Sequence, residues 1–295
     1  MVSELSSYSI TGGFEIFDEL IRTLPDNKRI RPTQSLTSAW LRKDQKAALE
    51  WLKSLENGTT KDAALQSACQ SIGFDDVMLA SQLAQQIQSE TQQAFTFGTI
   101  AGQSMKNPEV GLTWLKTITK QTNYFRAVAS GMYALGQKDP MKAVSFAVSQ
   151  SDLGLRSEAI YQLASSWGRL EPEAALNGLL ALEDQALRER GVVTVVARWA
   201  NQDPHGVAKQ LDLLKPKSLR DAAIKKFIKE IHYSRPETAA PWLPQIDITS
   251  LGMIPVEIGL KLLKTHPERG KDLIETLPES MKRQAISQAK RRKLW

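Results

Sequence analysis

Few residues in this chain have the types and spacings that catalysis or metal binding requires. The three histidines, His205, His232 and His266, have no second histidine or cysteine at the spacing of a metal ligand. Cys69 is the single cysteine, and its position in an apolar column predicts a buried, inert thiol. Neither a Gly-x-Ser-x-Gly motif nor a Gly-Lys-Ser phosphate loop occurs. We therefore expect no enzyme activity, no metal and no cofactor.

Paired carboxylates occur, but their positions favour a role in helix capping over acid–base chemistry. Asp75-Asp76 and Glu183-Asp184 each directly precede a predicted helix. A carboxylate at this point is stabilised by the positive end of the helix.

Basic residues form the one set whose pattern could bind a ligand. They recur sixteen residues after a periodic proline, with the last one residue short: Lys61, Arg156, Arg188, Arg220 and Lys282. A stacked column of cations could contact phosphates or acidic side chains. The same column could instead form a structural ion-pair ladder between repeats, and this is the interpretation we favour.

The positive charge is concentrated in the last third of the chain. Residues 201–295 hold 18 Lys and Arg against 11 Asp and Glu, whereas residues 1–200 hold 20 against 21. This charge forms either a solubilising polar cap on a final repeat or a surface that binds phosphates or acids. The candidate basic surface comprises Arg156, Arg188, Arg220, Lys225, Lys226, Lys229, Lys282, Arg283, Lys290 and Arg291.

An internal repeat sets the positions of these residues. Six prolines are spaced by 31 or 32 residues: Pro108, Pro140, Pro172, Pro204, Pro236 and Pro267. Most follow a polar residue, a pattern typical of a helix whose N-cap is polar and whose first helical residue is proline. A small residue follows three positions later, and the register extends back to Ala80 and Ala48.

Each repeat contains two helical stretches with apolar residues at helical spacing, and no strand pattern competes. The sequence therefore predicts an all-α fold, an α-solenoid of about nine two-helix repeats in a single domain, residues 1–295. Residues 13–43 form a degenerate first repeat, with helices near Phe14–Thr23 and Pro32–Arg42. Residues 44–295 form eight repeats, of which the last is a polar cap. Trp167 and Trp199 occupy equivalent positions and should be buried between repeats.

Two consecutive repeats resemble a known family. Asp152–Arg156 and Asp184–Arg188 share the pattern Asp-x-x-apolar-Arg, each followed by an alanine-containing helix and then by Glu171-Pro172 or Asp203-Pro204. This combination resembles the HEAT-like repeats of the phycobilin-lyase type. The resemblance implies the fold and an ion-pair role for these aspartates and arginines. It implies no activity, because such repeats serve many functions.

These observations favour a non-enzymatic scaffold that binds a protein or peptide on a concave face lined by the second helices. The alternative is nucleic-acid binding through the basic C-terminal third, similar to the grip of HEAT-like alkylpurine DNA glycosylases on duplex DNA. No apolar run approaches the roughly 18 residues that span a bilayer, and Met1–Ile10 lacks a signal-peptide pattern. With the single cysteine, this predicts a cytoplasmic protein without membrane partners.

Overall fold

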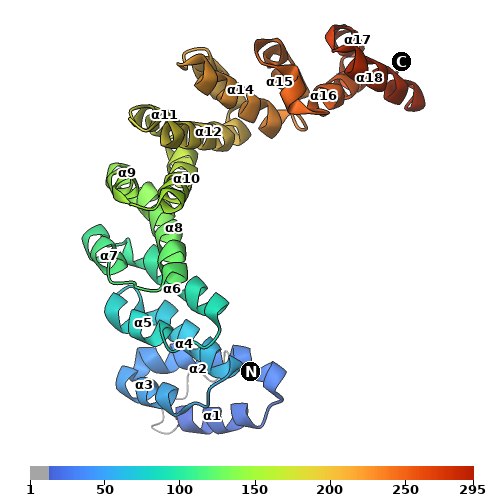
Figure 1. The fold of residues 1–295 in the computed structure, drawn as a ribbon. Coiled ribbons are helices and arrows are strands. Elements are labelled where there is room, and N and C mark those ends of the chain that lie inside the picture. Colours follow the sequence, from blue (N-terminus) through green and yellow to red (C-terminus); the bar gives the residue numbers. More distant parts are fainter. Residues whose placement is uncertain (1–12) are drawn as a thin grey trace. The chain divides into compact units, whose positions relative to one another are not determined.

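The computed structural model describes residues 13–295, so Met1–Ile10 lies outside the described residues. These residues form eighteen α-helices and no strand (Figure 1). In chain order, the helices are α1 (Gly13–Arg22), α2 (Asp26–Lys43), α3 (Gln45–Ser54), α4 (Thr59–Ile72), α5 (Val77–Ala84), α6 (Glu90–Ser104), α7 (Pro108–Leu115), α8 (Gln121–Lys138), α9 (Pro140–Ser149), α10 (Leu153–Leu170), α11 (Pro172–Leu180), α12 (Gln185–Gln202), α13 (Pro204–Leu211), α14 (Lys217–Ile231), α15 (Pro236–Ala239), the 3-10 helices η2 (Ala240–Gln245) and η3 (Ile248–Leu251), α16 (Ile254–Thr265), α17 (Pro267–Thr276) and α18 (Glu279–Arg291).

The helices form nine consecutive pairs, in which the first helix is odd-numbered and the second even-numbered. The chain divides into two compact units, an N-terminal unit of residues 1–162 and a C-terminal unit of residues 163–295. In the N-terminal unit α2 packs on α4, α4 on α6 and α6 on α8 (Figure 1). In the C-terminal unit α12 packs on α14 and α16 on α18. Each unit is thus a stack of helix pairs, which confirms the predicted all-α repeat fold.

The periodic prolines begin helices as predicted. Each of the six is the first residue of its helix, from α7 to α17. There the missing N–H of proline removes no helical hydrogen bond. The Asp139 carboxylate caps α9 by accepting from the Lys142 N–H at 3.0 Å, and Asp203 caps α13 in the same way.

The first repeat differs from the prediction at one helix start. Its second helix, α2, begins at Asp26, so Pro32 lies inside the helix instead of at its start. An internal proline removes one N–H donor. Packing compensates for this loss, because Leu36 and Trp40 of the same helix are buried where α2 packs on α3 and α4.

The column of small residues marks where a first helix crosses the end of the preceding second helix. All eight members are buried: Ala48, Ala80, Gly111, Ala143, Ala175, Val207, Ala239 and Gly270. The approach is close at Gly270, where an added Cβ would lie 2.3 Å from the Leu263 backbone nitrogen. Larger side chains would separate the two helices.

Trp167 and Trp199 are buried as predicted, with 5% and 4% of their surface exposed. The tryptophan also explains a break in another column. Most repeats place a large apolar residue six positions after the proline, but Gly178 stands there in the sixth repeat. An added Cβ at Gly178 would lie 2.4 Å from Cη2 of Trp167, so the ring fills that space. Two repeats earlier the sizes are reversed. Ser104 stands at the position equivalent to Trp167, and the buried Trp114 stands at the position equivalent to Gly178.

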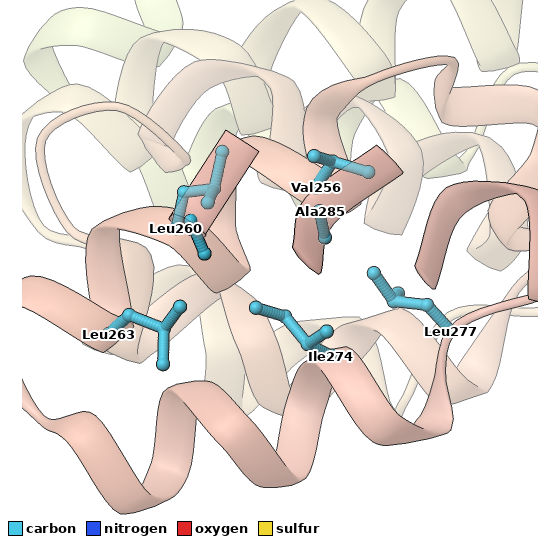
Figure 2. Packing of buried hydrophobic residues seen from close by; sticks show 7 residues of the cluster. Val256, Leu260, Leu263, Ile274, Leu277 and Ala285 are labelled. Atoms are coloured by element: carbon cyan, nitrogen blue, oxygen red, sulfur yellow. The ribbon is translucent and has the colours of Figure 1, made fainter. Parts of the chain in front are cut away.

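The last repeat, α17 and α18, shares an apolar core with α16 of the repeat before it. Val256, Leu260 and Leu263 of α16 face Ile274 of α17, and Figure 2 shows these side chains pointing toward one another with Leu277 and Ala285. All are buried. Burying apolar surface contributes about 25 cal/mol per Å², so this cluster stabilises the packing of α17 and α18 on α16.

Candidate functional site

The residues with catalytic potential are scattered through the structure. In residues 13–295 no three His, Cys, Asp or Glu side chains gather as a metal site would need, and no helix there has the length and apolarity to cross a bilayer. Burial raises the pKa of the Cys69 thiol to about 12, so this side chain stays protonated and unreactive at neutral pH. Its sulfur donates to the Ala80 carbonyl at 3.2 Å.

Three of the five cations in the predicted column bind main-chain carbonyls. Arg188 donates from Nη1 to the Leu182 carbonyl at 2.7 Å, and Arg156 donates from Nε and Nη2 to the Gln150 carbonyl at 3.0 and 2.7 Å. Lys61 contacts the Leu55 carbonyl, so each cation reaches the loop six residues before it in its own repeat. These three cations therefore fix the loop between the two helices of a repeat.

The aspartates of the family-like motif cap helices. Asp152 accepts from the Leu155 N–H at 2.7 Å and Asp184 from the Leu187 N–H at 3.0 Å. Both therefore satisfy an otherwise unpaired donor in the first helical turn.

Several other candidate cations are held in ion pairs. Arg220 pairs with Asp212 at 2.5 Å, Lys226 with Glu230 at 2.6 Å, and Arg283 with Glu279 at 3.7 Å; Lys282 pairs with Glu275. Besides Arg188, which binds a carbonyl, four candidates have no ion pair in the part of the chain that the structure describes: Lys225, Lys229, Lys290 and Arg291.

Charge in the C-terminal unit is divided between the two kinds of helix. The second helices α12, α14, α16 and α18 hold 14 Lys and Arg against 5 Asp and Glu, a net charge of +9. The first helices α11, α13, α15 and α17 hold 3 against 5, a net charge of −2. An anionic partner would therefore be attracted to the second helices.

A polar cavity of about 370 Å³ in the N-terminal unit was not predicted. It is lined by residues at the N-terminal ends of α6 and α8 and in the loops before them: Gln85, Gln93, Phe97, Ile118, Thr119, Lys120 and Asn123. Gln93 donates from Nε2 to the carbonyls of Gln85 and Ile87, at 3.1 and 3.2 Å. Its Oε1 accepts from Asn123 Nδ2 at 3.0 Å and from Lys120 Nζ at 3.2 Å.

These hydrogen bonds fix the orientation of the Asn123 amide. Because the amide nitrogen of Gln93 faces two carbonyls, its oxygen must face Asn123, which therefore presents its own nitrogen. Asn123 Oδ1 is then left as a buried acceptor, with no hydrogen-bond partner among residues 13–295, and the whole residue is only 2% exposed. A buried acceptor without a partner costs about 1–3 kcal/mol. Five buried side-chain atoms of residues 13–295 lack a partner, and Asn123 Oδ1 is the one that belongs to a residue lining this cavity.

Lys120 adds a donor beside this acceptor. Its Nζ contacts Gln93 and, at 2.9 Å, the carboxylate of Glu90. Lysine has three donors, so one proton is left over. The hydrogen bond from Lys120 lowers the pKa of Glu90, and the pair leaves this part of the cavity wall without net charge.

The next repeat holds a second, smaller cavity of about 180 Å³. It is lined by Gln121, Tyr124, Phe125, Gln150, Ser151, Asp152 and Leu155. Phe125 is 44% exposed and gives this cavity an aromatic wall. The Tyr124 hydroxyl donates to Gln150 Oε1 at 2.7 Å, and Arg156 fixes the Gln150 carbonyl in the same loop.

The two cavities use equivalent positions of successive repeats. Four lining residues of the first have a counterpart in the second 32 residues later, as the pairs Ile118 and Gln150, Thr119 and Ser151, Lys120 and Asp152, and Asn123 and Leu155. A signal for the first cavity was present in the sequence. The position of Asn123 is occupied by leucine in the following repeats, at Leu155, Leu187, Leu219 and Leu251.

A comparison of the chain with known protein families, with characterised proteins and with solved structures finds no significant match.

Proposed function

We propose that this chain is a non-enzymatic cytoplasmic scaffold that binds an extended segment of a partner protein across the N-terminal ends of α6, α8 and α10. The observation that carries the proposal is the pair of cavities at equivalent positions of successive repeats, of which one contains an unpaired buried acceptor. Cavities repeated at the helix spacing suit a linear ligand better than a compact small molecule.

The dimensions support this assignment. Packed helices lie 8–10 Å apart. An extended chain in the polyproline II conformation rises about 3.1 Å per residue with three residues per turn. Residues i and i+3 of such a segment therefore point the same way about 9 Å apart, which matches the helix spacing. One such residue would enter the polar cavity at Asn123 and the other the aromatic cavity at Phe125.

Selection from a displayed library of random dodecapeptides, with the full chain as bait, tests the proposal. Enriched peptides should bind the wild-type chain and weaken at least about tenfold on Phe125→Ser, because exposed aromatic residues at binding sites carry a large share of the affinity. Met141→Ser is the matched control, since Met141 is a 56% exposed apolar residue on the first helix α9. Equal loss in both variants, or no enrichment, would exclude this surface.

Nucleic-acid binding by the C-terminal unit is a second candidate, supported by the net charge of +9 on its second helices. Four phosphate contacts from Lys225, Lys229, Lys290 and Arg291 would give a slope of log affinity against log salt of about −3 to −4, at roughly −0.9 per contact.

Fluorescence anisotropy of labelled duplex between 50 and 200 mM salt measures that slope. Removing Lys225 and Lys229 together should flatten it by about 2, whereas Lys120→Ala in the N-terminal unit should leave it unchanged. Binding that is absent at micromolar protein or insensitive to salt would leave the peptide scaffold as the function.

A further inference from the structure

The polar cavity between α6 and α8 holds one unused acceptor and one unused donor close to each other. Asn123 Nδ2 and Lys120 Nζ both contact Gln93 Oε1, at 3.0 and 3.2 Å, so these two nitrogens are at most about 6 Å apart. The other atom of the Asn123 amide, Oδ1, lacks a partner in the described chain. The Lys120 ammonium has a third N–H besides the two that contact Gln93 and Glu90. The cavity thus offers one site for a donor and one for an acceptor.

We propose that this cavity binds a carboxamide group, with its N–H donating to Asn123 Oδ1 and its carbonyl accepting from Lys120 Nζ. The inference rests on the proposed function, because the carboxamide belongs to the bound protein segment. It can be a main-chain peptide group or the side chain of asparagine or glutamine, which share the same chemistry.

Charged groups fit the cavity less well. An anion would meet the Asn123 oxygen, which can only accept hydrogen bonds, and would compete with Glu90 for Lys120. A cation would lie beside the Lys120 ammonium. A neutral group with both a donor and an acceptor satisfies both protein atoms and leaves the Glu90–Lys120 pair intact.

The residue at position 123 is better explained by binding than by folding. Leucine occupies the equivalent position in the following repeats, where Leu155, Leu187 and Leu219 are buried. An asparagine that served only to fill the core would leave its oxygen unpaired at a cost in stability. A bound N–H removes that cost.

Small amides titrated into the wild-type chain test the inference without any substitution. N-methylacetamide represents the main-chain source, acetamide the side-chain source, and N,N-dimethylacetamide lacks the N–H donor. The readout is the Asn123 side-chain amide resonance in ¹⁵N-resolved NMR spectra, assigned by its loss in Asn123→Leu. We expect saturable shifts with N-methylacetamide or acetamide, and at least about tenfold weaker binding of N,N-dimethylacetamide, because it leaves the buried oxygen unpaired.

The relative affinities of N-methylacetamide and acetamide then identify the source of the carboxamide. Equal shifts from all three probes would overturn the inference, because they would not depend on an N–H donor. The absence of shifts up to about 0.5 M would also overturn it and leave a cavity that holds water only. The scaffold proposal is tested separately. If peptides bind through Phe125 but the three amides bind equally, only the carboxamide assignment is overturned. If the amides bind selectively but no peptide is enriched, only the proposed scaffold function is overturned.

Discussion

The buried residue in the first turn of the second helices differs in kind along the chain. In α4, α6 and α8 it is polar, at Asp62, Gln93 and Asn123, whereas α10, α12 and α14 bury a leucine there, at Leu155, Leu187 and Leu219. The Asp62 carboxylate accepts from the backbone N–H groups of Gln88 and Ser89 at 2.9 and 3.1 Å. The N-terminal unit therefore uses polar side chains to fix its loops, where the later repeats bury leucine.

The charges of the two units differ as well. The second helices α4, α6 and α8 hold 3 Lys and Arg against 2 Asp and Glu, and only α2, with 5 against 1, is strongly basic in that unit. The second helices of the C-terminal unit reach +9. The comparison indicates that the N-terminal unit offers specific hydrogen bonds in a nearly neutral setting, whereas the C-terminal unit offers long-range attraction.

The largest expected effect tests whether the C-terminal unit depends on its apolar core. Trp199→Ala should lower the free energy of unfolding by about 3–5 kcal/mol, because a buried large aromatic side chain is replaced by a cavity. Urea denaturation followed by circular dichroism measures the change. An unchanged midpoint would show that the Trp199 ring does not stabilise the fold.

Exchanging the asparagine and leucine found at equivalent positions, Asn123 and Leu187, tests the difference between the repeats directly. Leu187→Asn should cost about 2–4 kcal/mol, because it removes buried apolar surface and places an amide among apolar neighbours. Asn123→Leu should be nearly neutral or stabilise by up to about 1 kcal/mol, because it removes a buried acceptor that has no partner. Thermal unfolding of both variants against the wild-type chain measures the difference.

The outcome for Asn123→Leu decides between two roles of the amide. A loss of stability as large as that of Leu187→Asn would mean that the amide supports the core, and the carboxamide site would lose its physical basis. Gln93 keeps its hydrogen bond from Lys120 in this variant, so the substitution does not leave a second buried group unpaired.

The sequence predicted the repeat fold because its signals are local. Proline at the first helical position and small residues at the crossings recur at fixed spacing, and each acts within its own repeat or the next. Pro32 misled the prediction, because a helix start and an internal proline tolerated by packing have the same sequence signal. The cation column was predicted from spacing, but spacing could not show that Arg188 binds a carbonyl of its own loop.

The polar cavity was missed for a geometric reason. Gln93 precedes Asn123 by 30 residues, whereas the register runs 31 residues from Val77, which stands at the proline position of its repeat, to Pro108. The register therefore aligns Asn123 with Gln92 instead of Gln93. The shift hides the polar column from a pattern count. The hydrogen bonds from Asn123 to Gln93 and on to the Gln85 carbonyl also depend on side-chain orientation, which spacing does not determine.

A smaller effect is expected from two glycines that differ in their surroundings. Gly270→Ala should cost about 1–3 kcal/mol, because the new Cβ would lie 2.3 Å from a backbone atom of Leu263 that cannot move freely. Gly102→Ala in α6 should stabilise by about 0.5–1 kcal/mol, since nothing lies within 4 Å of its added Cβ and alanine favours the helix. Urea midpoints of the two variants should therefore move in opposite directions. Equal shifts would mean that the small column reflects composition and not close helix crossing.

The smallest expected effect separates the two kinds of cation in the C-terminal unit. Arg188→Ala should lower the free energy of unfolding by about 0.5–1.5 kcal/mol, because the Leu182 carbonyl loses its donor from Nη1. Lys229→Ala should change it by no more than about 0.5 kcal/mol, because this exposed side chain has no ion pair in the described chain. Chemical denaturation gives both values, and duplex binding of the same variants should respond in the opposite order if the second helices bind nucleic acid. Since one Arg188 hydrogen bond fixes a loop and Lys229 fixes nothing, equal stability losses would refute the division of these cations into structural and available groups.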